Sequence, residues 1–216
     1  MTEKSQINPD LIPAPEDEDA DTLGYYRRMQ DAVEALLILK GIFSPEDLAR
    51  EMKAVSGRTF ANGGKVVARA WTDPAYRERL LTDPAKACAE LGFDLGAMQL
   101  VVHENTPKVH NVIVCTLCSC YPRMLLGMPP DWYKSMTYRS RVVREPRAVL
   151  KEFGTVVPEE VEIRVHDSTA DLRYMVLPMR PAGTEGLDED TLAALVTRDC
   201  LLGVTQPLLK PTAAAQ

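Results

Sequence analysis

The feature that most constrains this chain is the six-residue segment Cys115–Cys120, which holds three of its five cysteines. Residues 109–114, directly before it, are rich in β-branched side chains, a composition that predicts a strand ending at the first of these cysteines. A chain that leaves a strand and places three thiols so close together can bring their sulfurs to one point in a single tight turn. We therefore expect a metal or redox site at the end of a strand.

Several kinds of site use closely spaced thiols, and the rest of the sequence separates them. A zinc ribbon needs a second Cys-x-x-Cys pair, which the chain lacks, and an iron–sulfur cluster normally needs four cysteines, whereas Cys200 lies eighty residues beyond Cys120. A Cys3His zinc site would need His110, but that residue lies on the predicted strand, where its side chain is more simply packed or exposed. A redox pair of the Cys-x-x-Cys kind leaves Cys120 without a role.

The spacing permits a ligand set of a different kind. In a tight turn the three sulfurs can reach one face of an ion, and the peptide nitrogens of Ser119 and Cys120 then lie within ligand range. If those two amides lose their protons, sulfur and nitrogen together fill five positions of an octahedron and leave one for water or substrate. Such a set favours a small trivalent ion, which acts as a Lewis acid and lowers the pKa of whatever occupies the open position.

Charge and hydropathy exclude several kinds of partner. The formal net charge of -6 argues against nucleic acid, because phosphate binding needs a positive field. No apolar run approaches the roughly 20 residues needed to span a bilayer, and the first residues lack the layout of a secretory signal. We expect a cytoplasmic protein, in which the isolated Cys88 and Cys200 are small buried hydrophobes rather than disulfide partners.

Helical signals dominate the first part of the chain. Apolar residues recur at helical spacing between Gly24 and Gly41, and Ser44-Pro45-Glu46-Asp47 is typical of a helix start. The apolar surplus around these two helices is expected to contact another subunit; it consists of Tyr25, Tyr26, Leu39, Ile42 and Phe43. Asp73-Pro74 and Asp83-Pro84 each predict the start of a further helix.

Beyond Gly92 the residue pattern predicts strands, two before and two after the cysteine segment, with short helices beside them. Strands that follow one another along the chain are expected to pair, the first two around a turn at residues 105–107. The fold class is α+β, with an N-terminal helical arm followed by a layered α-β-β-α domain. We predict four segments: a mobile acidic tail (1–22), a helical arm for subunit contact (23–60), a metal-binding catalytic domain (61–207) and a C-terminal tail (208–216).

The cysteine segment also resembles a known motif. Val114-Cys115-Thr116-Leu117-Cys118-Ser119-Cys120 is similar to the metal claw of nitrile hydratase alpha subunits, and Thr116 resembles the cobalt-type members. Other segments resemble the family in the same order, so the resemblance covers about residues 25–207. These segments are residues 70–74, 104–106, 129–134, 138–147, 180–184 and 195–199.

The resemblance implies a ligand set and a reaction. Cys115, Cys118 and Cys120 would hold one Co(III) per chain through sulfur, and Ser119 and Cys120 through backbone nitrogen. In the family, the residue matching Cys118 is oxidised to a sulfinic acid and the residue matching Cys120 to a sulfenic acid, so Cys118, Ser119 and Cys120 are the expected catalytic residues. The implied reaction is hydration of a small nitrile to an amide. Either the metal polarises the nitrile or the Cys120 sulfenate oxygen attacks its carbon.

By the same resemblance, this chain is half of an active site. Arginines of a beta-type subunit stabilise the oxidised sulfurs in the family, so a heteromer with such a subunit is expected, and a separate activator that loads the metal stays open. Within this chain, a basic run is expected to form an intersubunit salt-bridge surface, from which one or two members reach the oxidised sulfurs. The run consists of Arg139, Arg141, Arg144 and Arg147.

After the claw the sequence departs from the family. Nitrile hydratases usually continue with a Trp-Pro pair that lines the substrate pocket, whereas this chain has Tyr121-Pro122-Arg123-Met124. Arg123 and Met124 are candidate pocket residues, although Arg123 could equally face the subunit interface. An arginine there suits an anion, and thiocyanate hydrolase, a sister family, has one in its gamma subunit. Two alternatives therefore stay open: a gamma-like subunit of a thiocyanate hydrolase, and a structural zinc-binding interaction module.

Overall fold

The computed structural model describes residues 20–118 and 120–209, which form two compact units. The first unit ends at Gly57 and the second begins at Arg58. The tail predicted for residues 1–22 lies outside the described residues except for its last three, and so does most of the tail predicted for residues 208–216. Both tails therefore stay predictions.

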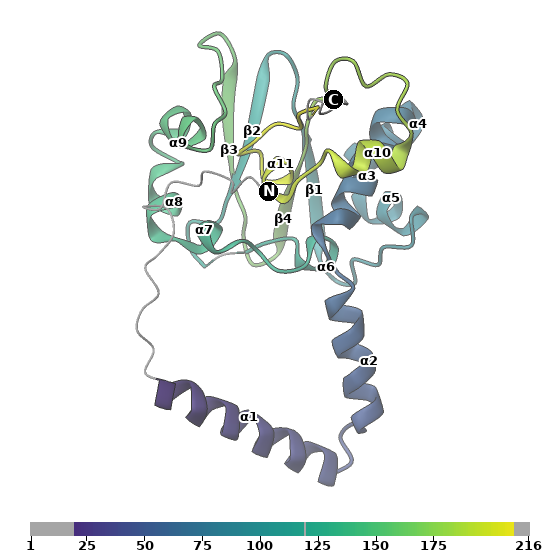
Figure 1. The fold of residues 1–216 in the computed structure, drawn as a ribbon, viewed down its shortest axis with the longest axis vertical. Helices are drawn as coiled ribbons and strands as arrows, with labels where there is room; N and C mark the ends of the chain where they lie inside the picture. The colour runs from purple at the N-terminus through teal and green to yellow at the C-terminus, as the bar shows by residue number, and fades with distance from the viewer. Residues whose placement is uncertain (1–19, 119, 210–216) are drawn as a thin grey trace, which may run out of the picture. The chain divides into compact units, whose positions relative to one another are not determined.

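The described chain alternates between helices and strands (Figure 1). Its helices are α1 (Ala20–Leu39), α2 (Pro45–Ser56), α3 (Phe60–Thr72), α4 (Pro74–Thr82), α5 (Pro84–Glu90), α6 (Arg123–Leu126), α7 (Asp131–Lys134), α8 (Met136–Arg141), α9 (Pro146–Glu152), α10 (Glu189–Ala194) and α11 (Arg198–Leu201). Its strands are β1 (Gln99–Glu104), β2 (Val109–Val114), β3 (Glu162–Asp167) and β4 (Leu172–Leu177). Within this part of the chain, no helix combines the length and the apolar composition needed to cross a bilayer.

Side-chain caps fix the helix starts that the sequence predicts. At α2, Ser44 Oγ accepts the N–H of Asp47 at 3.0 Å, and the Asp47 carboxylate accepts the N–H of Ser44 at 3.0 Å. This reciprocal capping box satisfies two N–H groups that the helix leaves without partners. The carboxylates of Asp73 and Asp83 accept N–H groups in the same way at α4 and α5, where a proline occupies the first helical position.

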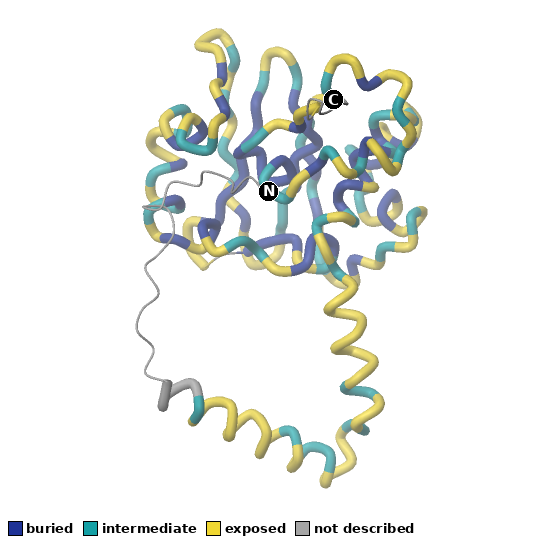
Figure 2. Tube along the Cα trace, viewed as in Figure 1, coloured by how far each residue is buried: buried dark blue, intermediate teal, exposed yellow. Residues whose placement is uncertain are grey.

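The first unit consists of α1 and α2, and it exposes much of its apolar surface. No residue of α2 is buried, and Figure 2 shows this helix as mostly exposed. Around α1, Leu39 is 84% exposed, Ile42 66% and Tyr26 61%. A two-helix unit with this much apolar surface in contact with water fits the predicted role in subunit contact, which nonetheless stays a prediction.

The strand pairing differs from the prediction. The four strands of the described part form two parallel pairs, β1 with β4 and β2 with β3, so strands that follow one another along the chain are not partners. In the second pair Val114, the last residue before the cysteine loop, lies opposite Asp167. This register brings the end of β3 beside the start of the loop.

Asn105, buried in the turn after β1, bonds to both strand pairs. Its backbone N–H bonds to the carbonyl of Leu177 at 2.9 Å and so prolongs the β1–β4 pair. Its side-chain Oδ1 accepts the N–H of Asn111 on β2 at 2.7 Å, a donor that a hairpin partner would otherwise use. The Asn105 side chain thus joins the two sheets, and β2 pairs with β3.

The second unit has the predicted layered order. Helices α4 and α5 pack against β1, β4 packs against β2, and α9 packs against β3, so two sheets lie between two helical layers (Figure 1). β2 is buried from His110 to Val114, and the β1–β4 sheet packs against it through β4. The mixed fold of helices and strands with N-terminal helices is confirmed.

The two isolated cysteines lie in this core, as expected. Cys88 is fully buried, and burial raises the pKa of its thiol to about 12. Cys200 is also buried, with its Sγ 3.1 Å from Thr197 Oγ1. Both thiols are buried, whereas a reactive cysteine is accessible to its reaction partner.

Candidate metal centre

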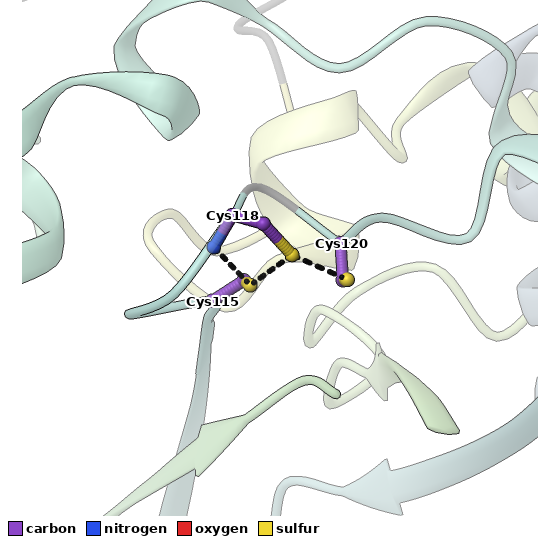
Figure 3. A group of neighbouring side chains, drawn as sticks. All are labelled: Cys115, Cys118 and Cys120. Carbon is purple, nitrogen blue, oxygen red and sulfur yellow. Dashed lines mark hydrogen bonds between the residues drawn. The ribbon is translucent and has the colours of Figure 1, made fainter. Parts of the chain in front are cut away.

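Cys115, Cys118 and Cys120 converge in the loop that follows β2 (Figure 3). The Sγ of Cys118 lies 3.6 Å from that of Cys115 and 3.0 Å from that of Cys120, and all three sulfurs lie within 4.8 Å of one another. The N–H of Cys118 also donates to Cys115 Sγ at 3.3 Å. The structure thus brings together the three predicted sulfur ligands. Ser119 lies outside the described residues, so its role as a ligand through backbone nitrogen stays a prediction.

The sulfur positions fit one small ion. With metal–sulfur bonds of about 2.3 Å, two thiolates lie ~3.3 Å apart at a right angle and ~3.8 Å apart at a tetrahedral angle. The two observed distances, 3.0 and 3.6 Å, lie on either side of the right-angle value and below the tetrahedral one. Within residues 20–118 and 120–209, no histidine or carboxylate joins this group. A structural zinc ion needs four protein ligands, which counts against the zinc-module alternative.

His110, the candidate fourth zinc ligand, is occupied elsewhere in the core. Its Nε2 lies 2.7 Å from the carbonyl oxygen of Gly203, so this nitrogen carries the proton and donates it. Its Nδ1 lies 3.5 Å from the side-chain amide nitrogen of Asn105 and accepts from it. Burial lowers the pKa of His110, which keeps the ring neutral. A histidine with both ring nitrogens engaged in this way is a core residue and is not a metal ligand here.

Burial within the cluster is uneven, and this shapes its electrostatics. Cys115 and Cys120 are buried, whereas Cys118 is exposed. Burial, together with the hydrogen bond to Cys118, raises the pKa of Cys120 to about 12. Because a thiol must ionise to bind a metal, the cation itself has to supply the charge that stabilises this thiolate. The exposed Cys118 marks the side of the cluster that other molecules can reach.

Two side chains hold carbonyl groups of the cysteine loop. The Arg139 guanidinium donates from Nε to the carbonyl of Cys115 at 2.9 Å and from Nη2 to that of Thr116 at 2.7 Å. Tyr133 donates its hydroxyl to the carbonyl of Cys120 at 2.8 Å. Burial raises the pKa of Tyr133 well above its ordinary value, so the phenol stays a donor. The first and last cysteines are thus each fixed through their own backbone.

Asp167 holds the loop from the side of β3. Its Oδ1 accepts the N–H of Thr116 at 2.9 Å, and its Oδ2 accepts the Thr116 hydroxyl at 2.5 Å. On the strand before the loop, the buried Tyr138 donates its hydroxyl to the carbonyl of Ile113 at 2.7 Å. The loop is thus bonded by Asp167, Tyr133 and Arg139, which are distant from it in sequence, whereas Tyr138 bonds to the strand.

Sequence reasoning did not identify these supporting contacts. No sequence pattern indicates the contacts of Asp167 and Tyr133 with the loop, and only the parallel pairing of β2 with β3 points to Asp167. The sequence predicts that the basic run forms an intersubunit salt-bridge surface, and within this chain its members have different partners. Arg141 forms ion pairs with Glu145 and Glu152, Arg147 donates to carbonyls of the loop before β3, Arg144 donates to the carbonyl of Ser140, and Arg139 holds the cysteine loop.

The two candidate pocket residues begin α6, just after the cluster. Arg123 is exposed, and its Nη2 lies 3.3 Å from the sulfur of Met128. Met124 is half-buried and packs against the hydrophobic core. The role of both side chains in a substrate pocket stays a prediction.

A layered unit of helices and strands, with three thiols converging on a loop that is held through its backbone, is typical of a protein able to bind a metal through thiolates. Comparison with known proteins narrows this class. A sequence profile described as "Nitrile hydratase, alpha chain" matches residues 25–205.

Individual relatives agree with this profile. The low-molecular weight cobalt-containing nitrile hydratase subunit alpha of Rhodococcus rhodochrous is 53% identical over 180 residues, which cover 82% of this chain and 86% of the relative. The thiocyanate hydrolase subunit gamma of Thiobacillus thioparus is 44% identical over 191 residues, which cover 83% of this chain and 79% of the relative. A solved structure, a double mutant of the Fe-type nitrile hydratase from Comamonas testosteroni Ni1, matches with a TM-score of 0.80 at 44% identity and covers 89% of this chain and 97% of its own.

The chain belongs to the nitrile hydratase alpha-chain family. The resemblance read from its sequence is confirmed, including the close relation to thiocyanate hydrolase gamma subunits, and so is the prediction of an enzyme subunit of this type.

Proposed function

We propose that this chain is the metal-bearing alpha subunit of a cobalt-type nitrile hydratase, which hydrates a nitrile to the amide in the cytoplasm. The observation that carries the proposal is the convergence of three sulfurs within 4.8 Å of one another on a loop with one exposed side. The relative from Rhodococcus rhodochrous is a cobalt-containing nitrile hydratase subunit, and its identity to this chain, 53%, supports the choice of metal and reaction.

In this proposal the ligands are the sulfurs of Cys115, Cys118 and Cys120 and the backbone nitrogens of Ser119 and Cys120. Cobalt(III), one ion per chain, would supply Lewis acidity at this site. Cys118 would be oxidised to a sulfinic acid and Cys120 to a sulfenic acid, the second and the first steps of thiol oxidation. The exposure of Cys118 supports its assignment as the more oxidised of the two, because oxidants reach it more readily.

The residues around the cluster would keep it in a single arrangement while substrate binds. Tyr133 and Arg139 hold the loop through its carbonyl oxygens, which leaves the sulfurs available for the metal. The exposed side at Cys118 would face the substrate and the partner subunit. Oxidised sulfurs carry negative charge, and cationic donors from a beta-type partner would stabilise them there.

The partner in this proposal is a beta-type subunit. The exposed apolar side chains of the two-helix unit, among them Leu39, Ile42 and Tyr26, would bind it, since burial of such side chains is favourable at about 25 cal/mol per Å². Loading of the metal by a separate activator protein is part of the same proposal. A small nitrile is the proposed substrate.

Co-expression of this chain with its beta-type partner in cobalt-supplemented medium tests the function. The complex should convert a small nitrile to the corresponding amide, and Cys118→Ala should abolish the conversion. Cys88→Ala is the matched control, because this thiol lies buried in the core, apart from the cluster, and its loss should leave turnover within about twofold. Turnover in Cys118→Ala equal to that of the native chain would refute the assignment.

One alternative rests on a specific feature. Arg123 is an exposed cation three residues after the cluster, and the gamma subunit of thiocyanate hydrolase is 44% identical to this chain. If Arg123 binds an anionic substrate, the complex should release carbonyl sulfide and ammonia from thiocyanate, and Arg123→Leu should raise the KM for thiocyanate without a similar change for nitriles. Amide formation from nitriles with no turnover of thiocyanate would exclude this alternative.

A further inference from the structure

Arg139 reaches from α8 to a loop that lies more than twenty residues earlier in the chain. Its Nε and Nη2 donate to two consecutive carbonyls, those of Cys115 and Thr116, at 2.9 and 2.7 Å. Both acceptors belong to the segment that carries the cysteines, and neither is a sulfur. Any effect of Arg139 on the cysteine cluster therefore acts through the backbone of the loop.

The contact matters because the same peptide group is held at its other end. The carbonyl between Cys115 and Thr116 accepts from Arg139, and the N–H of that peptide group donates to Asp167 Oδ1 at 2.9 Å. A peptide plane with both ends bonded cannot rotate without breaking a hydrogen bond. Its orientation sets the direction in which the chain leaves β2, and hence the position of Cys115 relative to the other two sulfurs.

Hydrophobic packing contributes little to the shape of this stretch. Thr116, Leu117 and Cys118 are all exposed, and Leu117 is 85% exposed. Loops with few buried apolar contacts open locally at low free energy. Charge-assisted hydrogen bonds from a half-buried arginine are the kind of contact that can keep such a loop in one conformation.

We propose that Arg139 is a positioning residue that shapes the cysteine loop for metal binding. This inference rests on the proposed metal centre and adds to it a residue that touches neither metal nor substrate. The guanidinium fork spans two acceptors at a fixed separation, which the single ammonium of lysine cannot do. Arg139→Lys should therefore restore only part of what Arg139→Gln loses.

Two measurements on the full-length chain test the inference. In the first, cobalt(II) binding to the reduced, metal-free chain is followed by sulfur-to-cobalt charge-transfer absorbance in competition with a chelator. The dissociation constant should rise about 10- to 100-fold in Arg139→Gln, the range found when outer contacts of a metal site are removed, and less in Arg139→Lys. The second is hydrogen exchange of the backbone amides of residues 116–118 without metal, which should be faster in Arg139→Gln.

Arg144→Gln provides the matched control. Arg144 lies five residues further along the chain, is exposed, and donates from Nε to the carbonyl of Ser140 within its own segment. The same chemical change there should leave cobalt affinity and loop exchange within about twofold of the native chain. Should Arg139→Gln fail to fold, cobalt affinity and loop exchange are measured in Arg139→Lys, which should differ from the native chain in the same direction but by less.

Each outcome is informative. Weaker cobalt binding together with faster loop exchange in the Arg139 variants alone supports the inference. Native affinity and native exchange in Arg139→Gln would overturn it. If the native chain takes up no cobalt, the proposed metal centre fails, whereas the exchange data still show whether Arg139 shapes the loop.

Discussion

Replacement of Tyr133 by phenylalanine removes only the hydroxyl that bonds to the backbone of the cysteine loop. Tyr133 is fully buried, and its hydroxyl donates to the carbonyl of Cys120 at 2.8 Å. The variant loses a net hydrogen bond worth about 0.5–1.5 kcal/mol, and the loss of this donor to a buried carbonyl brings the total to about 1–3 kcal/mol. For a chain of this length, each kcal/mol lowers the melting temperature by roughly 2–4 °C.

The chain offers a matched control in Tyr138→Phe. Tyr138 is also fully buried, its hydroxyl donates to the carbonyl of Ile113 at 2.7 Å, and burial raises its pKa as it does that of Tyr133. Both variants should lose similar free energy of unfolding in urea. Only Tyr133→Phe acts on a cysteine of the cluster, so only it should lower cobalt content and alter the sulfur-to-cobalt absorption. Equal cobalt content and identical spectra in the two variants would refute the view that the hydrogen bond from Tyr133 to the Cys120 carbonyl supports metal binding.

Two further predictions concern stability. Burial and the neighbouring His103, whose ring stacks on that of His166 with centroids 3.6 Å apart, lower the pKa of His166 to about 4. His166 therefore stays neutral in the folded chain, whereas in the unfolded chain it takes up a proton near pH 6.5. The contribution of the neutral His166 to the free energy of unfolding is fully present above about pH 6.5 and is lost as the pH falls toward 4. The loss is about 1–2 kcal/mol once solvent screening of these half-buried rings is included. The groups that contact or face His166 are His103, Asn111, Arg164 and Tyr174. The free energy of unfolding should therefore fall between pH 7.5 and 5 less steeply in His166→Phe than in the native chain, and equal slopes would contradict this. Gly203 has a φ of +78°, and a side chain there would collide with the backbone oxygen of Asn111, so Gly203→Ala should destabilise the fold by more than about 3 kcal/mol in urea; a loss below 1 kcal/mol would show that the turn can shift.

Local features of the fold could be predicted from the sequence because a few adjacent residues determine them. Ser44 and Asp47 form the expected cap at α2, and Asp73 and Asp83 cap α4 and α5, since each reaches N–H groups two or three positions further along. The strand that leads into the cysteine loop is equally local, because β-branched residues form it. The spacing of the three cysteines is also local, and it predicts that their thiols can converge.

The remaining features depend on contacts between distant segments, which no local pattern encodes. The pairing of β2 with β3 joins segments about fifty residues apart, and the Asn105 side chain bonds to β2 from the turn after β1. The contacts of Tyr133, Arg139 and Asp167 with the loop exist only once α7, α8 and β3 have packed around it. Sequence patterns show that an arginine is present, but its hydrogen-bond acceptors become evident only in the folded chain.

Elemental analysis of the purified complex, formed by co-expression with the proposed beta-type partner in cobalt-supplemented medium, tests the central claim most directly. The account predicts one cobalt per chain in the native protein and a loss of cobalt in Cys115→Ala, since Cys115 is one of the three converging sulfurs. Zinc in place of cobalt, or cobalt retained in full by Cys115→Ala, would contradict the account.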